Sequence, residues 1–152
     1  MILKQMELAD ETATTALGAA LAPLLRRGDI IRLEGDLGTG KSTLARGLIA
    51  ALTGVEEAPS PTFTLVETYD GPRFALWHFD LYRLEAPEDV WELGLEDALD
   101  GAAALIEWPE RIEELLPVGA LTVRLEVAGA ARSARLEGDG DWKARLEGAG
   151  IA

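Results

Sequence analysis

The sequence predicts an α/β fold in which helices cover a mostly parallel central sheet. Segments with the apolar pattern of strands alternate along the chain with segments whose apolar residues have helical spacing. One strand-to-helix junction, residues 35–42, fits the pattern GxxxxGK followed by Ser or Thr. Two further apolar strands end in a carboxylate, at Asp80 and at Glu107. Together these observations predict a P-loop NTPase-like three-layer fold with added antiparallel hairpins, formed by residues 1–152 as one domain.

The first half of the chain supplies a strand, a loop and a helix in that order. Before the loop we expect a weak strand at residues 1–8, a helix from Asp10 to about Arg27 that Gly28 ends, and a strand at residues 30–34. After the loop, residues 41–53 carry leucines on one helical face, and Gly54 follows as a helix stop. The loop is therefore expected to join a buried strand to the first turn of a helix.

The second half combines hairpins with a buried strand. Asp70-Gly71-Pro72 separates two alternating segments, residues 63–69 and 73–80, and predicts a hairpin. Residues 102–108 form an almost unbroken apolar run, which is typical of a central parallel strand. The other expected elements are a helix from Pro87 to about Leu99 interrupted at Gly94, a short helix at residues 109–116, a hairpin of residues 120–127 and 131–137, and a short helix at residues 142–146.

The loop at residues 35–42 indicates a site for ATP or GTP. Its glycines let the backbone bring successive N–H groups close to a β-phosphate. Lys41 supplies an ammonium group for the β- and γ-phosphate oxygens, and the Ser42 hydroxyl is placed to bind the Mg²⁺ that bridges them. Thr43 lies outside the pattern but could contribute. The predicted nucleotide-binding residues of this region are Gly35, Asp36, Leu37, Gly38, Thr39, Gly40, Lys41, Ser42 and Thr43.

Asp80 and Glu107 are the candidate acids of the site. A carboxylate at the end of a strand faces the crevice in which open α/β folds hold their ligands. Asp80 could hold Mg²⁺ directly or through water, whereas Glu107 is either the alternative Mg²⁺ partner or the group that orients the attacking water. A helix-capping or solvent-exposed carboxylate remains the alternative for both residues.

Two further features have an open interpretation. Residues 58–63 contain two prolines and form either a switch-like loop whose Thr62 meets the γ-phosphate or a plain connector. His78 precedes Asp80 on the same predicted strand, where a lone histidine is more often structural than catalytic. Arg-Leu-Glu recurs along the chain at unequal spacings, which favours biased composition over a structural repeat.

Composition limits the classes of function. A formal net charge of −13 argues against a surface that follows a nucleic-acid backbone, because such a surface needs clustered Lys and Arg. The chain has no cysteine and one histidine, which excludes a thiolate or multi-histidine zinc site and favours oxygen-bound Mg²⁺. No apolar run is long enough for a membrane span and no leader is evident, so we expect a cytoplasmic protein without membrane attachment.

The order and spacing of four motifs resemble the TsaE (YjeE) family over roughly residues 10–127. The motifs are the loop at residues 35–42, Ser60-Pro61-Thr62-Phe63-Thr64-Leu65-Val66, His78-Phe79-Asp80-Leu81-Tyr82-Arg83 and Glu107-Trp108-Pro109. The resemblance implies a small P-loop ATPase needed to form threonylcarbamoyladenosine in tRNA. Its ATP hydrolysis would reset a complex of the TsaB and TsaD proteins, and it would meet tRNA only through that complex.

Carried over to this sequence, the resemblance assigns catalysis to Asp80, Glu107 and Lys41. It implies Mg²⁺ ligands at Ser42, Asp80 and Glu107, and a switch at residues 60–62 that includes the nucleotide-contacting Thr62. Ser42 departs from the Thr of many members but also provides a hydroxyl. Because the sequence shows no clear arginine finger, we expect slow hydrolysis by the isolated chain and stimulation by its partners.

Two rival functions use the same motifs. A small-molecule kinase would share the loop, Mg²⁺ and the acidic strand ends, but it would need an acceptor site and usually a lid, for which no motif is evident. A nucleotide-sensing adaptor would bind ATP and change partners without needing hydrolysis. Product analysis separates the kinase from the ATPase, and a hydrolysis-defective variant separates the adaptor from both.

Overall fold

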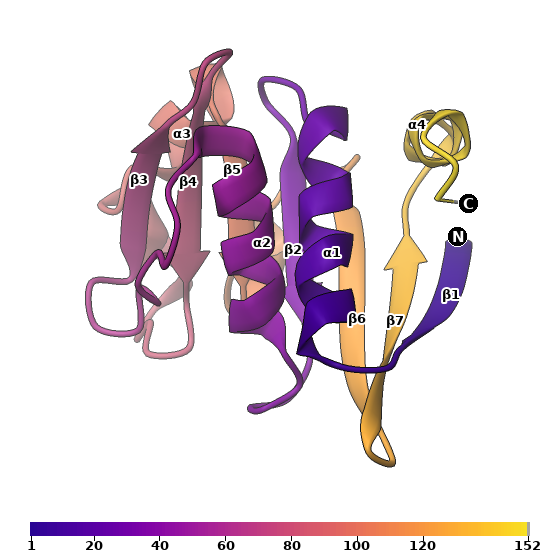
Figure 1. Ribbon diagram of the computed structural model, residues 1–152. Coiled ribbons are helices and arrows are strands. Elements are labelled where there is room, and N and C mark those ends of the chain that lie inside the picture. Colours follow the sequence, from indigo (N-terminus) through magenta and orange to yellow (C-terminus); the bar gives the residue numbers. More distant parts are fainter. Residues whose placement is uncertain (152) are drawn as a thin grey trace.

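A seven-stranded mixed sheet forms the centre of the computed structural model, which describes residues 1–151 (Figure 1). The strand order is β1-β7-β6-β2-β5-β4-β3. Neighbouring strands among β4, β5, β2 and β6 run parallel, whereas β3, β7 and β1 each pair with their neighbour in antiparallel fashion. The strands are β1 (Ile2–Leu8), β2 (Ile30–Glu34), β3 (Val66–Asp70), β4 (Ala75–Asp80), β5 (Ala103–Glu107), β6 (Leu121–Ala128) and β7 (Ala131–Glu137).

Helices cover the sheet on both sides, which gives the three predicted layers. In Figure 1, α1 (Glu11–Leu21) and α2 (Lys41–Thr53) lie in front of the sheet and α3 (Leu95–Gly101) lies behind it. The short 3₁₀ helices are η1 (Ala22–Leu24), η2 (Pro87–Trp91) and η3 (Pro109–Leu115), and the last element is the helix α4 (Gly140–Gly148). The predicted fold class and both predicted hairpins are confirmed.

Strand β5 shows why the middle of the sheet reads as a continuous apolar run. Its alternate residues Ala103 and Leu105 pack into the cluster that contains α1 and α2. Ala104 and Ile106 pack into the opposite cluster, with α3 and η2. Because both faces of this strand are buried, its residues are apolar on both faces and do not alternate with polar ones.

Helices α1 and α2 approach each other closely at a glycine. A Cβ atom added at Gly47 of α2 would lie 2.3 Å from the carbonyl oxygen of Thr15 in α1, which no side chain tolerates. This contact holds α1 against α2, the helix that follows the loop at residues 35–42. The first turns of both helices lie at the same end of the sheet (Figure 1).

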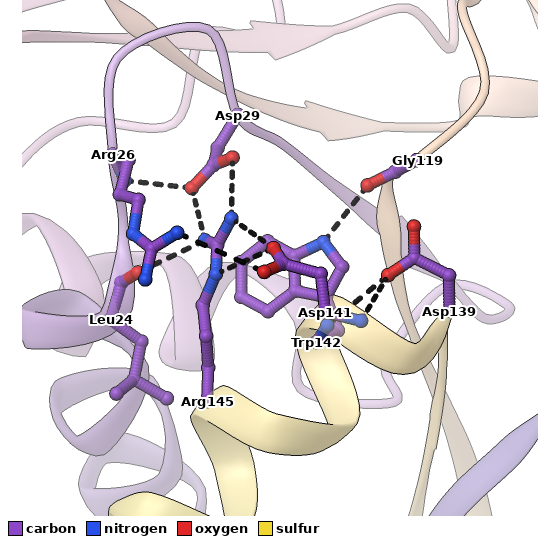
Figure 2. A network of polar contacts seen from close by, with 8 residues as sticks. All are labelled: Leu24, Arg26, Asp29, Gly119, Asp139, Asp141, Trp142 and Arg145. Carbon is purple, nitrogen blue, oxygen red and sulfur yellow. Dashed lines mark hydrogen bonds and ion pairs between the residues drawn. The ribbon is translucent and has the colours of Figure 1, made fainter.

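A polar network holds helix α4 against the segment that follows α1 (Figure 2). Arg145 donates to Asp29 at 2.6 Å and to Asp141 at 2.7 Å, and it also donates to the carbonyl oxygen of Leu24. Asp139 caps the helix by accepting from two backbone N–H groups, and the Trp142 indole donates to the carbonyl oxygen of Gly119. Polar contacts therefore tie this helix to two distant parts of the chain, residues 24–29 and Gly119.

The interruption predicted at Gly94 is confirmed, since this residue has a φ of 94° and separates the 3₁₀ helix η2 from α3. Two other predicted boundaries are wrong. Helix α1 ends at Leu21 and continues only as the 3₁₀ turn η1, because Pro23 cannot continue the hydrogen-bonded α-helix expected to reach Arg27. Strand β3 begins at Val66 instead of Phe63, since residues 62–64 form a turn.

No helix within residues 1–151 combines the length and the apolar character needed to cross a membrane.

Candidate nucleotide-binding site

The phosphate loop, residues 35–42, joins the end of β2 to the beginning of α2. Gly35 has a φ of 147°, and a Cβ atom there would lie 2.5 Å from the carbonyl oxygen of Leu125 and 2.7 Å from Oγ1 of Thr39. A residue without a side chain is therefore required where the loop leaves the sheet. The last two residues of the loop, Lys41 and Ser42, are the first two of the 13-residue helix α2, so the positive end of the helix dipole faces the loop.

Lys41 folds back over the loop and is 6% exposed. Its Nζ donates to the carbonyl oxygens of Gly35 and Asp36 and lies 4.0 Å from the centroid of the Trp108 ring. Burial lowers the pKa of Lys41, and the nearby charges of Glu107 and Asp80 oppose that shift. The ammonium group thus has neutral partners and no hydrogen-bonded carboxylate among the described residues, so an anionic ligand would find it available.

Asp80 and Glu107 lie side by side because β4 and β5 are parallel neighbours that end together. The sheet register pairs these two residues directly. Asp80 is 6% exposed and Glu107 is 3% exposed, so both carboxylates are largely removed from solvent. Burial raises the pKa of Asp80, and the charge of Glu107 adds to that shift. Two carboxylates held close together in a buried position favour a bound cation between or beside them.

The residues before β3 contact Asp80. The Thr62 hydroxyl donates to one oxygen of Asp80 at 3.4 Å, and it also hydrogen-bonds the Ser60 hydroxyl at 2.9 Å. The other Asp80 oxygen accepts from the backbone N–H of Tyr82 at 3.2 Å. Phe63, the next residue after Thr62, is 82% exposed. Within the 58–63 segment, Thr62 therefore contacts Asp80, whereas the next residue, Phe63, is exposed to solvent.

His78 contacts the second acid. Its Nε2 lies 2.7 Å from Oε2 of Glu107, and both side chains are 3% exposed. From the sequence alone, His78 could have a structural or a catalytic role. The structure places it in contact with a candidate site residue but not on the cavity wall.

A cavity of about 610 Å³ brings the predicted residues together. Nine of the twelve predicted residues line it, whereas Gly35, Asp36 and Thr39 do not. Those three shape the loop from behind: Thr39 donates to the carbonyl oxygen of Asp36 at 2.8 Å, and the carbonyl groups of the other two accept from Lys41. The predicted residues on the wall include Lys41, Ser42, Thr43, Thr62, Asp80 and Glu107, together with Leu37, Gly38 and Gly40.

Two parts of the wall were missed by sequence reasoning. One is the junction of β1 and α1, residues 8–11 with Thr14, and the other is the tip of the β6–β7 hairpin, residues 130–132. Arg132 of that tip donates to the carbonyl oxygen of Gly38 at 3.1 Å, which joins the hairpin to the phosphate loop. These segments carry no motif; only the fold brings them to the loop.

The donor set suits a hard cation that a ligand helps to hold. Within residues 1–151, no cluster of three or more His, Cys, Asp or Glu side chains could hold a metal ion by itself. The cavity wall does carry the Ser42 hydroxyl and the carboxylates of Asp80 and Glu107. Oxygen donors are what Mg²⁺ prefers, and Mg²⁺ in nucleotide sites usually combines one or two protein ligands with phosphate oxygens and water. These residues therefore fit MgATP better than a metal ion held by protein alone.

Comparison with known proteins agrees with the geometry. Residues 8–135 match the model of a family described as "Threonylcarbamoyl adenosine biosynthesis protein TsaE". The "tRNA threonylcarbamoyladenosine biosynthesis protein TsaE" of Rickettsia bellii is 43% identical over 84% of this chain and 89% of its own length. The protein of the same name from Haemophilus influenzae is 35% identical over 84% of each chain.

The fold also matches a solved structure. The crystal structure of YdiB from Bacillus subtilis superposes with a TM-score of 0.80 at 29% identity and covers 99% of this chain and 96% of that chain. The match of the family model and the identities to curated relatives together establish that this chain is a P-loop protein belonging to the TsaE family of threonylcarbamoyladenosine biosynthesis proteins.

Proposed function

We propose that this protein is a Mg²⁺-dependent ATPase of low intrinsic activity that serves the formation of threonylcarbamoyladenosine in tRNA. In this role its ATP hydrolysis resets a complex of the TsaB and TsaD proteins. The observation that carries the proposal is the convergence of three buried charged residues, Lys41, Asp80 and Glu107, on one cavity at the phosphate loop.

Binding of the triphosphate relies on groups that are already directed toward the cavity. The backbone of the phosphate loop and the first turn of α2 would hold the β-phosphate. Lys41 would exchange its carbonyl partners for phosphate oxygens, because a charged acceptor makes a stronger hydrogen bond than a neutral carbonyl group. The hairpin tip and the β1–α1 junction would then flank the remainder of the nucleotide.

The two acids take different roles in this proposal. Bound Mg²⁺ would neutralise charge on the phosphates, and Ser42 and Asp80 would hold it directly or through water. Glu107 would orient the attacking water, since its Oε2 is engaged by His78 and Oε1 is left for the cavity. The water oxygen bonds to the γ-phosphorus, the bond to the bridging oxygen breaks to leave ADP, and the water proton passes to Glu107 or to a phosphate oxygen.

The same arrangement supports the proposal that the isolated chain hydrolyses ATP slowly. Arg46 and Arg132 line the cavity, but Arg132 is engaged by the carbonyl oxygens of Gly38 and Ala131. Thr62 is turned to Asp80, and Phe63 beside it is exposed. A partner that binds the exposed ring would order the 58–63 segment over the γ-phosphate or supply a charge in trans.

Phosphate release from MgATP, with and without the TsaB and TsaD proteins, tests the proposal. We expect slow release by the chain alone and strong stimulation by the partners. Lys41→Ala should abolish both, whereas Lys143→Ala, at an exposed lysine of α4, should leave both unchanged. Asp80→Ala and Glu107→Ala should lower turnover by roughly 100-fold or more with a smaller effect on nucleotide affinity.

Three outcomes would overturn it. Unchanged turnover in both acid variants would remove the site assignment. A phosphorylated acceptor in place of free phosphate would identify a kinase. Support of the modification in cells by a Glu107→Gln protein without hydrolysis would identify a nucleotide-sensing adaptor.

A further inference from the structure

His78 is a buried polar residue that takes no direct part in the proposed reaction. It is the only histidine of the chain. Its side chain does not line the cavity, yet its Nε2 lies 2.7 Å from Oε2 of Glu107, which does. Among the described residues, it is the only hydrogen-bond partner of the Glu107 carboxylate.

The topology of the sheet fixes this contact. Strands β4 and β5 are parallel neighbours in a register that pairs His78 with Leu105 and Asp80 with Glu107. Side chains two positions apart on a strand share a face, so His78 and Asp80 lie on one face of β4 and Glu107 lies on the same face as Leu105. Leu105 packs into the cluster that contains α2, which places all three polar residues on the α2 side of the sheet. His78 therefore lies two positions before Asp80 on the same face of the sheet, next to the pair formed by the two acids.

The second ring nitrogen indicates which way the hydrogen bond points. Nδ1 of His78 is buried and has no hydrogen-bond partner among the described residues. A buried N–H without a partner is rarer in proteins than a buried lone pair without one, so the hydrogen belongs on Nε2. The imidazole donates this hydrogen to Glu107 whether the ring is neutral or protonated, and the contact does not depend on the charge of His78.

A donor at this place has a consequence for the acid. Glu107 is 3% exposed and stands directly beside Asp80, whose pKa its charge raises. Lys41, the nearby cation, donates to backbone carbonyl groups and not to Glu107. Without His78 the Glu107 carboxylate would have no hydrogen-bond donor among the described residues, so no protein group would fix its orientation at the cavity.

We propose that His78 is a positioning residue that holds the Glu107 carboxylate by donating its Nε2–H, so that Oε1 is directed to the attacking water. This inference rests on the proposed ATPase function for its effect on turnover. The hydrogen bond itself does not depend on that function and has a separate readout.

The kinetic test uses two side chains of nearly equal size at position 78. Gln offers an N–H near the place of Nε2, and Met offers none. At saturating MgATP and in the presence of partners, we expect His78→Met to lower kcat about tenfold or more, with KM and nucleotide affinity changed less than about threefold. His78→Gln should retain kcat within about threefold of the wild type.

A double variant separates positioning from a general structural effect. In a Glu107→Gln background, His78→Met should cost no further activity, because the group that it positions is already gone. Equal loss in the Gln and Met variants, or a His78→Met loss that is fully additive to that of Glu107→Gln, would overturn the proposal. Circular dichroism of each variant confirms that the proteins compared are folded.

Nuclear magnetic resonance of the single imidazole tests the contact without any hydrolysis. Long-range ¹H–¹⁵N correlation of the ring should show hydrogen on Nε2, with a signal that shifts in Glu107→Gln and not in Glu110→Gln, at an exposed glutamate three residues away. A ring with hydrogen on Nδ1 alone, or one indifferent to Glu107→Gln, would refute the inference even if the ATPase is confirmed. The expected spectrum in a protein that releases no phosphate would refute the proposed function and leave the contact established.

Discussion

Arg145 is a largely buried cation and Lys41 a buried one, and the molecule surrounds them differently. Arg145 contacts the carboxylates of Asp29 and Asp141 and the carbonyl oxygen of Leu24 (Figure 2). Among the residues that the structure describes, Lys41 contacts only two carbonyl groups and the face of Trp108, although Asp80 stands on the same cavity wall. The charges around α4 are neutralised by the protein itself, whereas those at the phosphate loop leave room for a ligand to neutralise them.

Backbone conformation shows the same division. The non-glycine residues with a positive φ in the described chain are Glu57, Leu65 and Trp108. Leu65 lies just after the 58–63 segment and Glu57 lies directly before it, whereas Trp108 directly follows Glu107. The network around α4 has none of them. Left-handed backbone costs free energy and persists where surrounding structure enforces it, so the cavity side of the molecule is expected to be optimised less for stability than the α4 side.

The largest effect on stability that this comparison predicts comes from the neutralised side. Arg145→Met should lower the free energy of unfolding by about 3 kcal/mol, because it leaves Asp29, 13% exposed, without its cation. Urea unfolding followed by circular dichroism measures the change.

Arg26→Met serves as the control for that variant. Arg26 is 64% exposed and lies 3.8 Å from Asp141, so its loss should cost less than about 0.5 kcal/mol. Equal destabilisation by the two variants would show that the buried position of Arg145 contributes nothing beyond an ordinary surface ion pair.

The cavity side should respond with the opposite sign. Asp80→Asn should raise the free energy of unfolding of the nucleotide-free protein at pH 7, because burial and Glu107 oppose the charge that the substitution removes. The pKa of Asp80 in the folded protein lies above its unfolded value of 3.8. As the pH falls from the folded pKa toward 3.8, Asp80 becomes protonated in the folded state first, so the wild type gains stability and the advantage of the Asn variant shrinks.

Thermal unfolding at a series of pH values measures this difference. Asp100→Asn, at an exposed aspartate of α3, should show no such pH-dependent advantage. Destabilisation by Asp80→Asn at pH 7 would mean that the hydrogen bonds from Thr62 and Tyr82 outweigh the unfavourable burial of the charge.

Local patterns in the sequence were enough to find the centre of the site. The phosphate loop is contiguous, and Asp80 and Glu107 are each the last residue of an apolar strand, so strand order was the only unknown in bringing them together. Element ends were less predictable. The break at Gly94 was predicted correctly, whereas the helix predicted to reach Arg27 ends at Leu21, two residues before Pro23.

Contacts between distant segments could not be predicted in the same way. Arg132 and the β1–α1 junction reach the cavity only because β7 pairs with β1 and turns its hairpin tip to the loop. The recurring Arg-Leu-Glu shows the same limit. Three copies lie on the neighbouring strands β2, β6 and β7, each with its leucine buried, and Arg124 pairs with Glu34 of the adjacent strand. Their spacing along the sequence gives no sign that these three copies lie on adjacent strands.

A smaller effect, on nucleotide affinity, is expected at Trp108, whose ring lies against the Lys41 ammonium group. Trp108→Leu should increase affinity for MgATP by about threefold, because a cation over an aromatic face gains about 0.5–1 kcal/mol or more that Lys41 must give up to reach the phosphates. Titration calorimetry measures the affinity, with Trp91→Leu as the control at an exposed tryptophan that does not line the cavity. Weaker binding would show instead that the ring contacts the nucleotide or stays on the lysine in the bound state.

The smallest effect concerns left-handed backbone in its simplest setting. Glu57 is exposed and has a φ of 54°, so Glu57→Gly should raise the free energy of unfolding by somewhat less than about 1 kcal/mol, since glycine adopts this conformation without a steric cost. Glu56→Gly is the matched variant: this neighbour is also an exposed glutamate but has no positive φ, and the greater freedom of unfolded glycine should make its replacement slightly destabilising. Opposite signs at adjacent positions in urea unfolding would attribute the cost to backbone conformation alone. The same sign at both would mean that side-chain charge in this acidic loop outweighs conformation, and the strain assigned to the cavity side would then rest on Leu65 and Trp108.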